Sequence, residues 1–389
     1  MKTRILLIED DAIHQAAYFL GQIIRDSSLE KEIEKIIDES ANEESNEKVY
    51  KKAIEMFLKH GENVFKHEHG INFYIIYINA ILSLESKDEQ QKQFLALVEN
   101  ISKDTTDHPE KRMDVLLQVS EVLEQANVLS EQDSEMYKGG NERKNSGSPS
   151  EYALHYTVVE KMLAYAIASK QTNKVNIDAE LMIQSIPFVE EKVMGKLFQH
   201  TIDILIAQGK REGANIMYKY LVEEGRNIQV EKSENEIAKA AINNILLLGS
   251  IPEFMEIYKV TKTKLNEADA KAVASLVAID STSTFEDCFS TNEAEKKQIR
   301  DFARVMVLNT LFTKNDAVSF ETIEKHLDNQ FKRDIMRGIQ LGAFNVKINN
   351  RKKEVNVQYV AYRPQINWNA ISDHIDTLKG AIDIVIDDH

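Results

Sequence analysis

Cysteine, proline and glycine are all scarce in this chain: its 389 residues include one cysteine, 5 prolines and 14 glycines. A single cysteine, Cys288, excludes an internal disulfide and is typical of a reducing compartment. We interpret Cys288 as a small buried apolar side chain, because no activating constellation accompanies it. With few helix-breaking residues, the composition favours long helices joined by short turns.

Long apolar runs are also missing. The first residues hold only a four-residue apolar run, Ile5–Ile8, before paired aspartates, which is not the pattern of a signal peptide. No stretch reaches the roughly 18 apolar residues of a membrane span, and the apolar region Phe73–Leu84 is interrupted by Asn79. We therefore expect a protein of the cytoplasm, with the nucleus as the alternative compartment, and no membrane partner.

Motifs of catalysis and cofactor binding are absent: there is no Gly-rich phosphate loop, no Gly-x-Ser-x-Gly elbow and no Cys-x-x-Cys pair. Ile5–Asp11 looks like the first strand of a phosphorylatable receiver domain, but the region 49–65, where the acceptor aspartate would lie, is helical and lysine-rich. His67-Glu68-His69 lacks the spacing of a helical zinc site. We expect no enzyme activity, no cofactor, no metal site and no small-molecule substrate.

The remaining composition is that of an ordinary globular chain, with 43% apolar and 29% charged residues. The net charge is −15, so the surface as a whole repels phosphate backbones. Any nucleic-acid contact must therefore be local, and an acidic surface selects basic patches on its partners.

Helical periodicity runs through the first 290 residues. We divide them into an N-terminal helical region (1–129), a flexible insertion (130–150) and a helical-repeat region (151–290). The predicted helices are 71–84, 88–102, 111–127, 151–169, 178–186, 187–208, 212–224, 234–248, 252–260 and 264–278. The predicted C-terminal caps are Gly61, Gly209, Gly225 and Gly249. Consecutive helical hairpins of this kind are typical of an α-solenoid.

A different pattern follows in residues 291–362. A buried helix, 294–312, precedes a helix capped by Ser319 and a second helix that ends at Gly342. Two alternating segments then predict strands, with apolar faces formed by Phe344, Val346 and Ile348 and by Val355, Val357 and Tyr359. Three helices followed by a hairpin is the order of a winged helix. We predict an all-α protein, an α-solenoid, with this small α/β module near its end.

Large apolar residues in the last segment, 363–389, are spaced 3, 4, 3, 4 and 3 apart, which is a strict heptad seam. The seam residues are Trp368, Ile371, Ile375, Leu378, Ile382 and Val385. An exposed stripe of this size needs a groove or other helices to cover it. The segment either folds back on its own module or joins helices of other subunits, and the strict heptad favours a helix bundle.

The basic residues of the end module are candidate nucleic-acid contacts. They are Lys332, Arg333 and Arg337 in the second helix and Arg351, Lys352 and Lys353 at the tip between the strands. These side chains would neutralise a few phosphates. The alternative is a solvated basic face, which we favour because no aromatic residues are interleaved for base stacking.

Helical repeats, a winged helix and a C-terminal helix follow one another in the PCI-domain subunits of the proteasome lid, the signalosome and translation initiation factor 3. Within this class the chain resembles the subunit m family of eukaryotic translation initiation factor 3. Val318–Thr322 resembles that family's Ile-Ser-Phe-Asp-Thr motif, and Val346–Asn349 resembles its wing strand. Arg363 and Trp368 match the Arg and Trp that lead its final helix. The similarity extends over about 150–389, and the insertion is a departure from the family.

The resemblance implies a non-catalytic scaffold whose winged helix and terminal helix both contact neighbouring subunits. The implied partners are other initiation factor 3 subunits, of the PCI and MPN types, and indirectly the small ribosomal subunit. The implied protein-binding residues are a strand edge of Asn345, Lys347, Gln358 and Val360, then Arg363 and the heptad seam. A subunit of the signalosome, or one shared by both complexes, is the alternative, and a winged-helix nucleic-acid binder is a further one.

Overall fold

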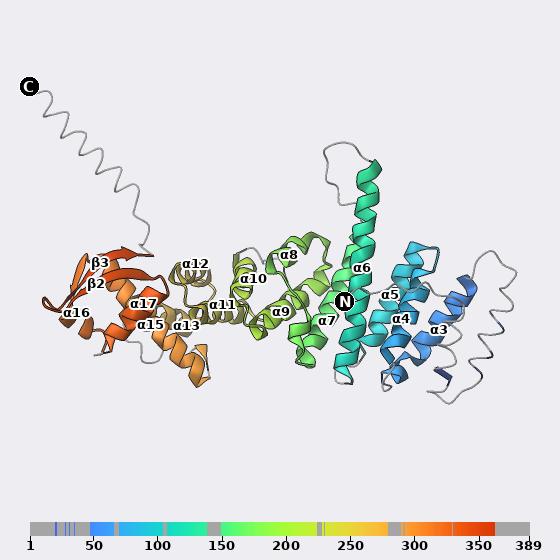
Figure 1. Cartoon of the computed structure of the whole chain (residues 1–389), viewed down its shortest axis with the longest axis horizontal. Helices are drawn as coiled ribbons and strands as arrows, with labels where there is room; N and C mark the ends of the chain where they lie inside the picture. The colour runs from blue at the N-terminus through green and yellow to red at the C-terminus, as the bar shows by residue number, and fades with distance from the viewer. Residues whose placement is uncertain are drawn as a thin grey trace, which may run out of the picture. The chain divides into compact units, whose positions relative to one another are not determined.

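The computed structural model describes residues 47–65, 70–103, 107–137, 149–223, 228, 230–278, 289–290, 292–328 and 330–361, together with 20, 21, 28, 31 and 35. These residues form fourteen α-helices, two short 3-10 helices and one three-stranded antiparallel sheet (Figure 1). The prediction of a mostly helical chain with a small α/β module is thus confirmed. Among the same residues, no helix combines the length and the apolar character that crossing a membrane requires.

The chain divides into two compact units. The N-terminal unit comprises Met1–Tyr220 and Gly225–Glu231, and the C-terminal unit comprises Leu221–Glu224 and Lys232–His389. No boundary was predicted at this position. Because helices both precede and follow the division, helical periodicity continues across it and composition does not mark it.

The N-terminal unit is entirely helical in its described residues. Its α-helices are α3 (Glu47–Val64), α4 (Gly70–Leu82), α5 (Lys87–Ile101), α6 (Pro109–Tyr137), α7 (Pro149–Ala168), α8 (Ala179–Gln184), α9 (Glu191–Ala207) and most of α10 (Arg211–Glu223). The short 3-10 helices are η1 (Thr172–Lys174) and η2 (Ile186–Phe188). Helices near each other in the sequence pack together: α3 against α4 and α5, α4 against α6, and α7 against α6 and α9.

An aromatic cluster joins α3 to α4. Phe57 packs edge-on against Phe73 with ring centroids 4.5 Å apart, and Phe65 stacks on Tyr74 at 4.7 Å. Tyr77 completes the cluster, 5.1 Å from Phe57. All five rings are buried, so this cluster is the core of the first helical pair.

Gly61 lies inside α3, so the expected C-terminal cap at this position is wrong. The Tyr74 hydroxyl donates a hydrogen bond of 3.0 Å to the Gly61 carbonyl oxygen, and a Cβ on Gly61 would lie 3.0 Å from that hydroxyl oxygen. The glycine allows α4 to approach closely. By contrast, Gly209, Gly249 and Gly342 have positive φ and follow the helices they were expected to end.

Both ends of the predicted insertion, 130–150, are helical, because α6 continues to Tyr137 and α7 starts at Pro149. Residues 130–137 contain no glycine or proline and include Glu131, Gln132, Glu135 and Met136, which favour a helix despite the low apolar content. The absence of an apolar stripe was therefore the wrong signal for the end of this helix. Residues 138–148 lie outside the described ranges.

The C-terminal unit begins with three helices, α11 (Glu234–Leu248), α12 (Ile251–Thr261) and α13 (Glu267–Ala278). Ser233 caps α11 in a capping box with Glu236. The long helix α15 (Glu293–Lys314) packs against α11 and α13 and also against α17 (Phe331–Gln340). The run Val305–Leu308 in α15 is buried, as predicted.

The last described part, Glu293–Val360, has the order α15, β1 (Ala317–Ser319), α16 (Phe320–Glu324), α17, β2 (Phe344–Asn349) and β3 (Glu354–Val360). We call it the sheet module. Its strands are antiparallel in the order β1-β3-β2, which makes β3 the central strand. Ser319 caps α16 as predicted, accepting a hydrogen bond from the Thr322 N–H. The three-residue strand β1 was not predicted, because it is too short to show an alternation.

A β-bulge changes the faces of β3. Asn345 pairs with Tyr359 and Val346 with Val357, so Gln358 is an extra residue in β3. An extra residue turns every later side chain to the opposite face. Tyr359 is therefore 55% exposed, whereas Val360 is buried. The prediction of Tyr359 on the apolar face was wrong for this reason.

Candidate functional site

The four residues of the predicted strand edge lie on two different strands. Asn345 and Lys347 project from β2, an edge strand, and both are exposed, so these two positions are available on the surface. Gln358 and Val360 belong to β3, beyond the residues that pair with β1, and the bulge buries the Val360 side chain at 4% exposure. The edge of the sheet on this side is therefore formed by β2 alone.

The basic residues of α17 have different environments. Arg337 forms an ion pair with Asp301 of α15. Lys332 lies over the Phe320 ring with its Nζ 5.1 Å from the centroid, and that Nζ is 3.5 Å from the Asn350 Oδ1. Arg333 lies between them in sequence and is exposed. Two of the three predicted cations therefore contribute to packing within the module.

The tip between β2 and β3 carries the other three predicted cations. Arg351, Lys352 and Lys353 are all exposed, and the Lys352 N–H donates to the Asn349 Oδ1 over 3.1 Å, which fixes the turn. Lys353 has φ of +52°, a left-handed conformation, and its carbonyl accepts the Phe320 N–H. The contact between Lys332 and Asn350 places the start of α17 beside this tip.

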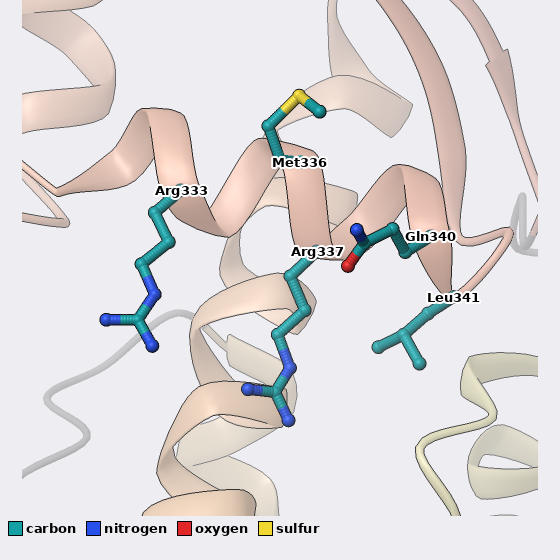
Figure 2. A pocket seen from close by; sticks show the side chains of 5 residues that line it. All are labelled: Arg333, Met336, Arg337, Gln340 and Leu341. Atoms are coloured by element: carbon teal, nitrogen blue, oxygen red, sulfur yellow. The ribbon is translucent and has the colours of Figure 1, made fainter.

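Residues on one face of α17 line a shallow hollow of about 470 Å³. We call it the α17 face, and its residues are Arg333, Met336, Arg337, Gln340 and Leu341. Figure 2 shows both arginines extending side by side from the helix, with Met336 above them in this view. Met336 is 55% and Leu341 41% exposed, so large apolar side chains lie among cations. Neither Met336 nor Leu341 was predicted from the sequence, although their spacing with Arg333 and Arg337 marks one side of a helix.

An ion network, buried at Asp334 and exposed at Asp328, holds α17 against α15. The Arg304 side chain binds Asp334 with its Nε over 2.9 Å and Asp328 with its Nη2 over 2.6 Å. Asp334 is buried, and the Gln330 N–H together with Arg304 lowers the pKa of Asp328. The network lies in a polar hollow of about 420 Å³ that Arg333 also lines. It orients the first turn of α17 and thereby the α17 face.

The sheet module differs in charge from the rest of the chain. Residues 293–361 contain 13 Lys and Arg against 9 Asp and Glu, a net charge of +4. The remaining residues contain 35 Lys and Arg against 54 Asp and Glu, a net charge of −19. The module is thus a basic surface on an acidic protein, and it favours acidic ligands.

A serine–histidine contact in the N-terminal unit has a structural explanation. Ser120 Oγ and His155 Nε2 are 3.1 Å apart and join α6 to α7. Burial lowers the pKa of His155 to about 4, so the ring is neutral at pH 7. Ser120 is itself buried, and the hydrogen bond satisfies two polar groups between packed helices.

Several predicted features lie outside the described residues: Arg363, the heptad seam from Trp368 to Val385, Cys288, and His67-Glu68-His69. Within the described residues, no cluster of three or more His, Cys, Asp or Glu side chains has a metal-binding arrangement. The described fold defines the class as a mostly helical protein with a basic three-stranded module. No protein-family model and no curated protein sequence matches the chain.

Proposed function

We propose that this chain is a non-catalytic scaffold subunit of eukaryotic translation initiation factor 3, a PCI-domain protein most similar to the subunit m family. The observation that carries the proposal is the topology of the sheet module. Helix, strand, helix, helix, strand and strand, with the sheet order β1-β3-β2, is the arrangement of a winged helix. It follows a series of helices packed on their sequence neighbours, which is the order of a PCI domain.

The position of the family-like motif supports the same assignment. Val318–Thr322 spans the junction of β1 and α16, with Ser319 as the cap of α16. Val346–Asn349 lies in β2, the edge strand of the module. An entry to a helix and an edge strand are the positions expected from the resemblance, so both segments support the proposal.

We assign the scaffold contacts to two surfaces. The first is the β2 edge with Asn345 and Lys347, whose unpaired side offers backbone groups to a neighbouring PCI subunit. The second is the heptad seam, which would join a bundle with terminal helices of other PCI and MPN subunits. The contact with the small ribosomal subunit would be indirect, through the assembled complex. The net charge of +4 in the module suits acidic neighbours.

Affinity purification of the tagged full-length chain from its own cells tests this proposal. We expect other initiation factor 3 subunits in the eluate and co-sedimentation with small ribosomal subunits. The double variant Ile375→Asp/Leu378→Asp should lose them, because charges in the seam cannot be buried in a bundle. The control Asn369→Asp/Thr377→Asp adds the same charge outside the seam and should retain them.

Recovery of the chain without any initiation factor subunit would contradict the proposal. Recovery with signalosome subunits and deneddylating activity would favour the alternative complex. If nucleic acid alone were recovered, and changing Arg333, Arg351 and Lys353 to Glu abolished it, the chain would be a nucleic-acid binder.

A further inference from the structure

The α17 face has the composition of a surface that another segment covers. Met336 and Leu341 are among the few large apolar side chains with more than a third of their surface exposed in the described residues. They lie in one hollow, flanked by Arg333 and Arg337. An apolar pair between cations suits an amphipathic helix with acidic residues beside its apolar stripe.

The chain leaves the sheet module next to this face. The Ala361 N–H donates to the Ala343 carbonyl over 2.8 Å, and Val360 pairs with Phe344. Ala343 is two residues after Leu341, which closes the hollow at the end of α17. The remaining 28 residues, 362–389, therefore start beside the α17 face.

The reach of this C-terminal segment is sufficient. The six residues from Ala361 to Asn367 span up to roughly 20 Å when extended. A helix over 367–385 would be about 28 Å long, whereas Arg333 to Leu341 covers about 12 Å of α17. The seam can therefore lie along the whole α17 face without rearrangement of the sheet.

Charge and tethering favour this occupant over a separate molecule. Residues 362–389 contain five aspartates against Arg363 and Lys379, so the segment is acidic where the α17 face is basic. Asp373 and Asp376 lie between the seam residues Ile371 and Leu378. A short tether gives an effective concentration of about millimolar, so even a weak contact forms within one chain.

We infer that in the free chain the C-terminal segment, residues 362–389, folds back and lays its heptad seam on the α17 face. The apolar seam residues cover Met336 and Leu341, and the aspartates pair with Arg333. In the proposed function the same seam enters a bundle with other subunits. The fold-back therefore belongs to the free subunit, and assembly displaces it, a step that rests on the proposed function.

Trp368 makes this contact measurable, because it is the only tryptophan in the chain and belongs to the seam. For the purified full-length chain alone, we expect blue-shifted emission and slow quenching by acrylamide, since the indole is buried. Met336→Asp/Leu341→Asp should shift the emission to the red and raise the quenching constant several-fold. Both replaced side chains are exposed, so the module should fold, and unchanged far-ultraviolet circular dichroism checks this.

A matched control changes exposed leucines on other helices. Leu95→Asp/Leu181→Asp adds the same charge at side chains that are 43% and 63% exposed, and should leave Trp368 emission unchanged. Solvent-like emission in the unmodified chain, or emission that the α17 variant does not change, would overturn the inference. Emission that depends on protein concentration would place the seam on a second copy and would also overturn it.

The outcome is separable from that of the proposed function. The fluorescence experiment uses no other subunit, so a chain that fails it can still co-purify with initiation factor 3. Conversely, the fold-back of a free chain stands if no complex is recovered. If both hold, Met336→Asp/Leu341→Asp should co-purify at least as well as the unmodified chain, because its seam is already free.

Discussion

Arg112 in the N-terminal unit and Arg333 in the sheet module illustrate two uses of the same side chain. Arg112 is 2% exposed, donates to the carbonyl oxygens of Ile101 and Asp107, and lies 4.5 Å over the Phe65 ring. Arg333 is exposed at the rim of a hollow that contains Met336 and Leu341. Arg112 is therefore buried and hydrogen-bonded within its own unit, whereas Arg333 is exposed beside apolar side chains.

The contrast extends to the surroundings of both residues. In the N-terminal unit, buried polar groups connect packed helices: the Tyr165 hydroxyl also donates to the Ile101 carbonyl, over 2.9 Å. In the sheet module, the ion network of Arg304, Asp328 and the buried Asp334 supports α17, whose Met336 and Leu341 side chains are exposed. Polar groups in the N-terminal unit therefore stabilise that unit, whereas those in the module also hold an exposed surface in place.

We expect the greatest loss of stability from a substitution that destabilises the sheet module and leaves the N-terminal unit intact. In Gly338→Ala, the new Cβ would lie 2.1 Å from the Cζ of Phe344, a buried ring that also packs edge-on against Phe312. Such overpacking should cost about 3 kcal/mol. Hydrogen exchange should show loss of protection in 331–360 and none in 47–65. Adding Phe344→Leu to Gly338→Ala should restore part of the protection in 331–360. Unchanged protection in Gly338→Ala would refute the close contact between Gly338 and Phe344.

A second substitution destabilises the N-terminal unit by removing hydrogen bonds rather than by overpacking. Arg112→Met keeps an unbranched side chain over Phe65 but removes its hydrogen bonds to two carbonyl groups. We expect a loss of about 2 kcal/mol in the free energy of unfolding, because bonds from a charged donor are worth more than neutral ones. Urea unfolding followed by exchange of α6 peptides measures it. Tyr165→Phe, which removes one neutral donor to Ile101, should cost less, and a reversed order would contradict this account.

A weaker dependence of stability on pH also distinguishes the two regions. Because burial lowers the pKa of His155 to about 4 from an ordinary 6.5, the unfolded chain binds more protons between these values. The stability of the N-terminal unit is then complete above pH 6.5 and falls as the pH drops toward 4. Between pH 7 and 5.5 the loss should be about 1 kcal/mol.

The sheet module should respond at lower pH. The pKa of Asp328 lies below its ordinary value, so its contribution is present above about pH 4 and is lost only under more acidic conditions. Thermal unfolding, monitored in each region by hydrogen exchange at pH values between 7 and 5.5, distinguishes the two regions. In His155→Gln the dependence of the N-terminal unit should disappear, and its persistence would assign the proton to another group.

Helix positions and much of the module followed from local sequence. Gly209, Gly249 and Gly342 ended helices as expected, because only glycine adopts their left-handed backbone without strain. The alternation of Phe344, Asn345, Val346 and Lys347 predicted both β2 and the exposed pair on its edge. Of the candidate site, the cations of α17 were found, but Met336 and Leu341 were not.

Other features depended on contacts that no local pattern records. Gly61 has a helical role because Tyr74 approaches it from the next helix, and Arg112 is buried because Phe65, Ile101 and Asp107 surround it. The pairing of Arg337 with Asp301 joins residues 36 positions apart. Sequence spacing reports the side of one helix, whereas these pairings depend on how different helices meet.

A mostly helical protein with a basic module of helices and strands was predictable from local sequence, because periodicity, caps and charge are properties of neighbouring residues. Which side chains of the module are exposed depends instead on tertiary contacts. The bulge at Gln358 buried Val360 and exposed Tyr359, β1 made β3 the central strand, and the packing of α15 left Arg333, Met336 and Leu341 outside. Each of these outcomes depends on pairing between distant segments, where one extra residue reverses the face that a side chain occupies.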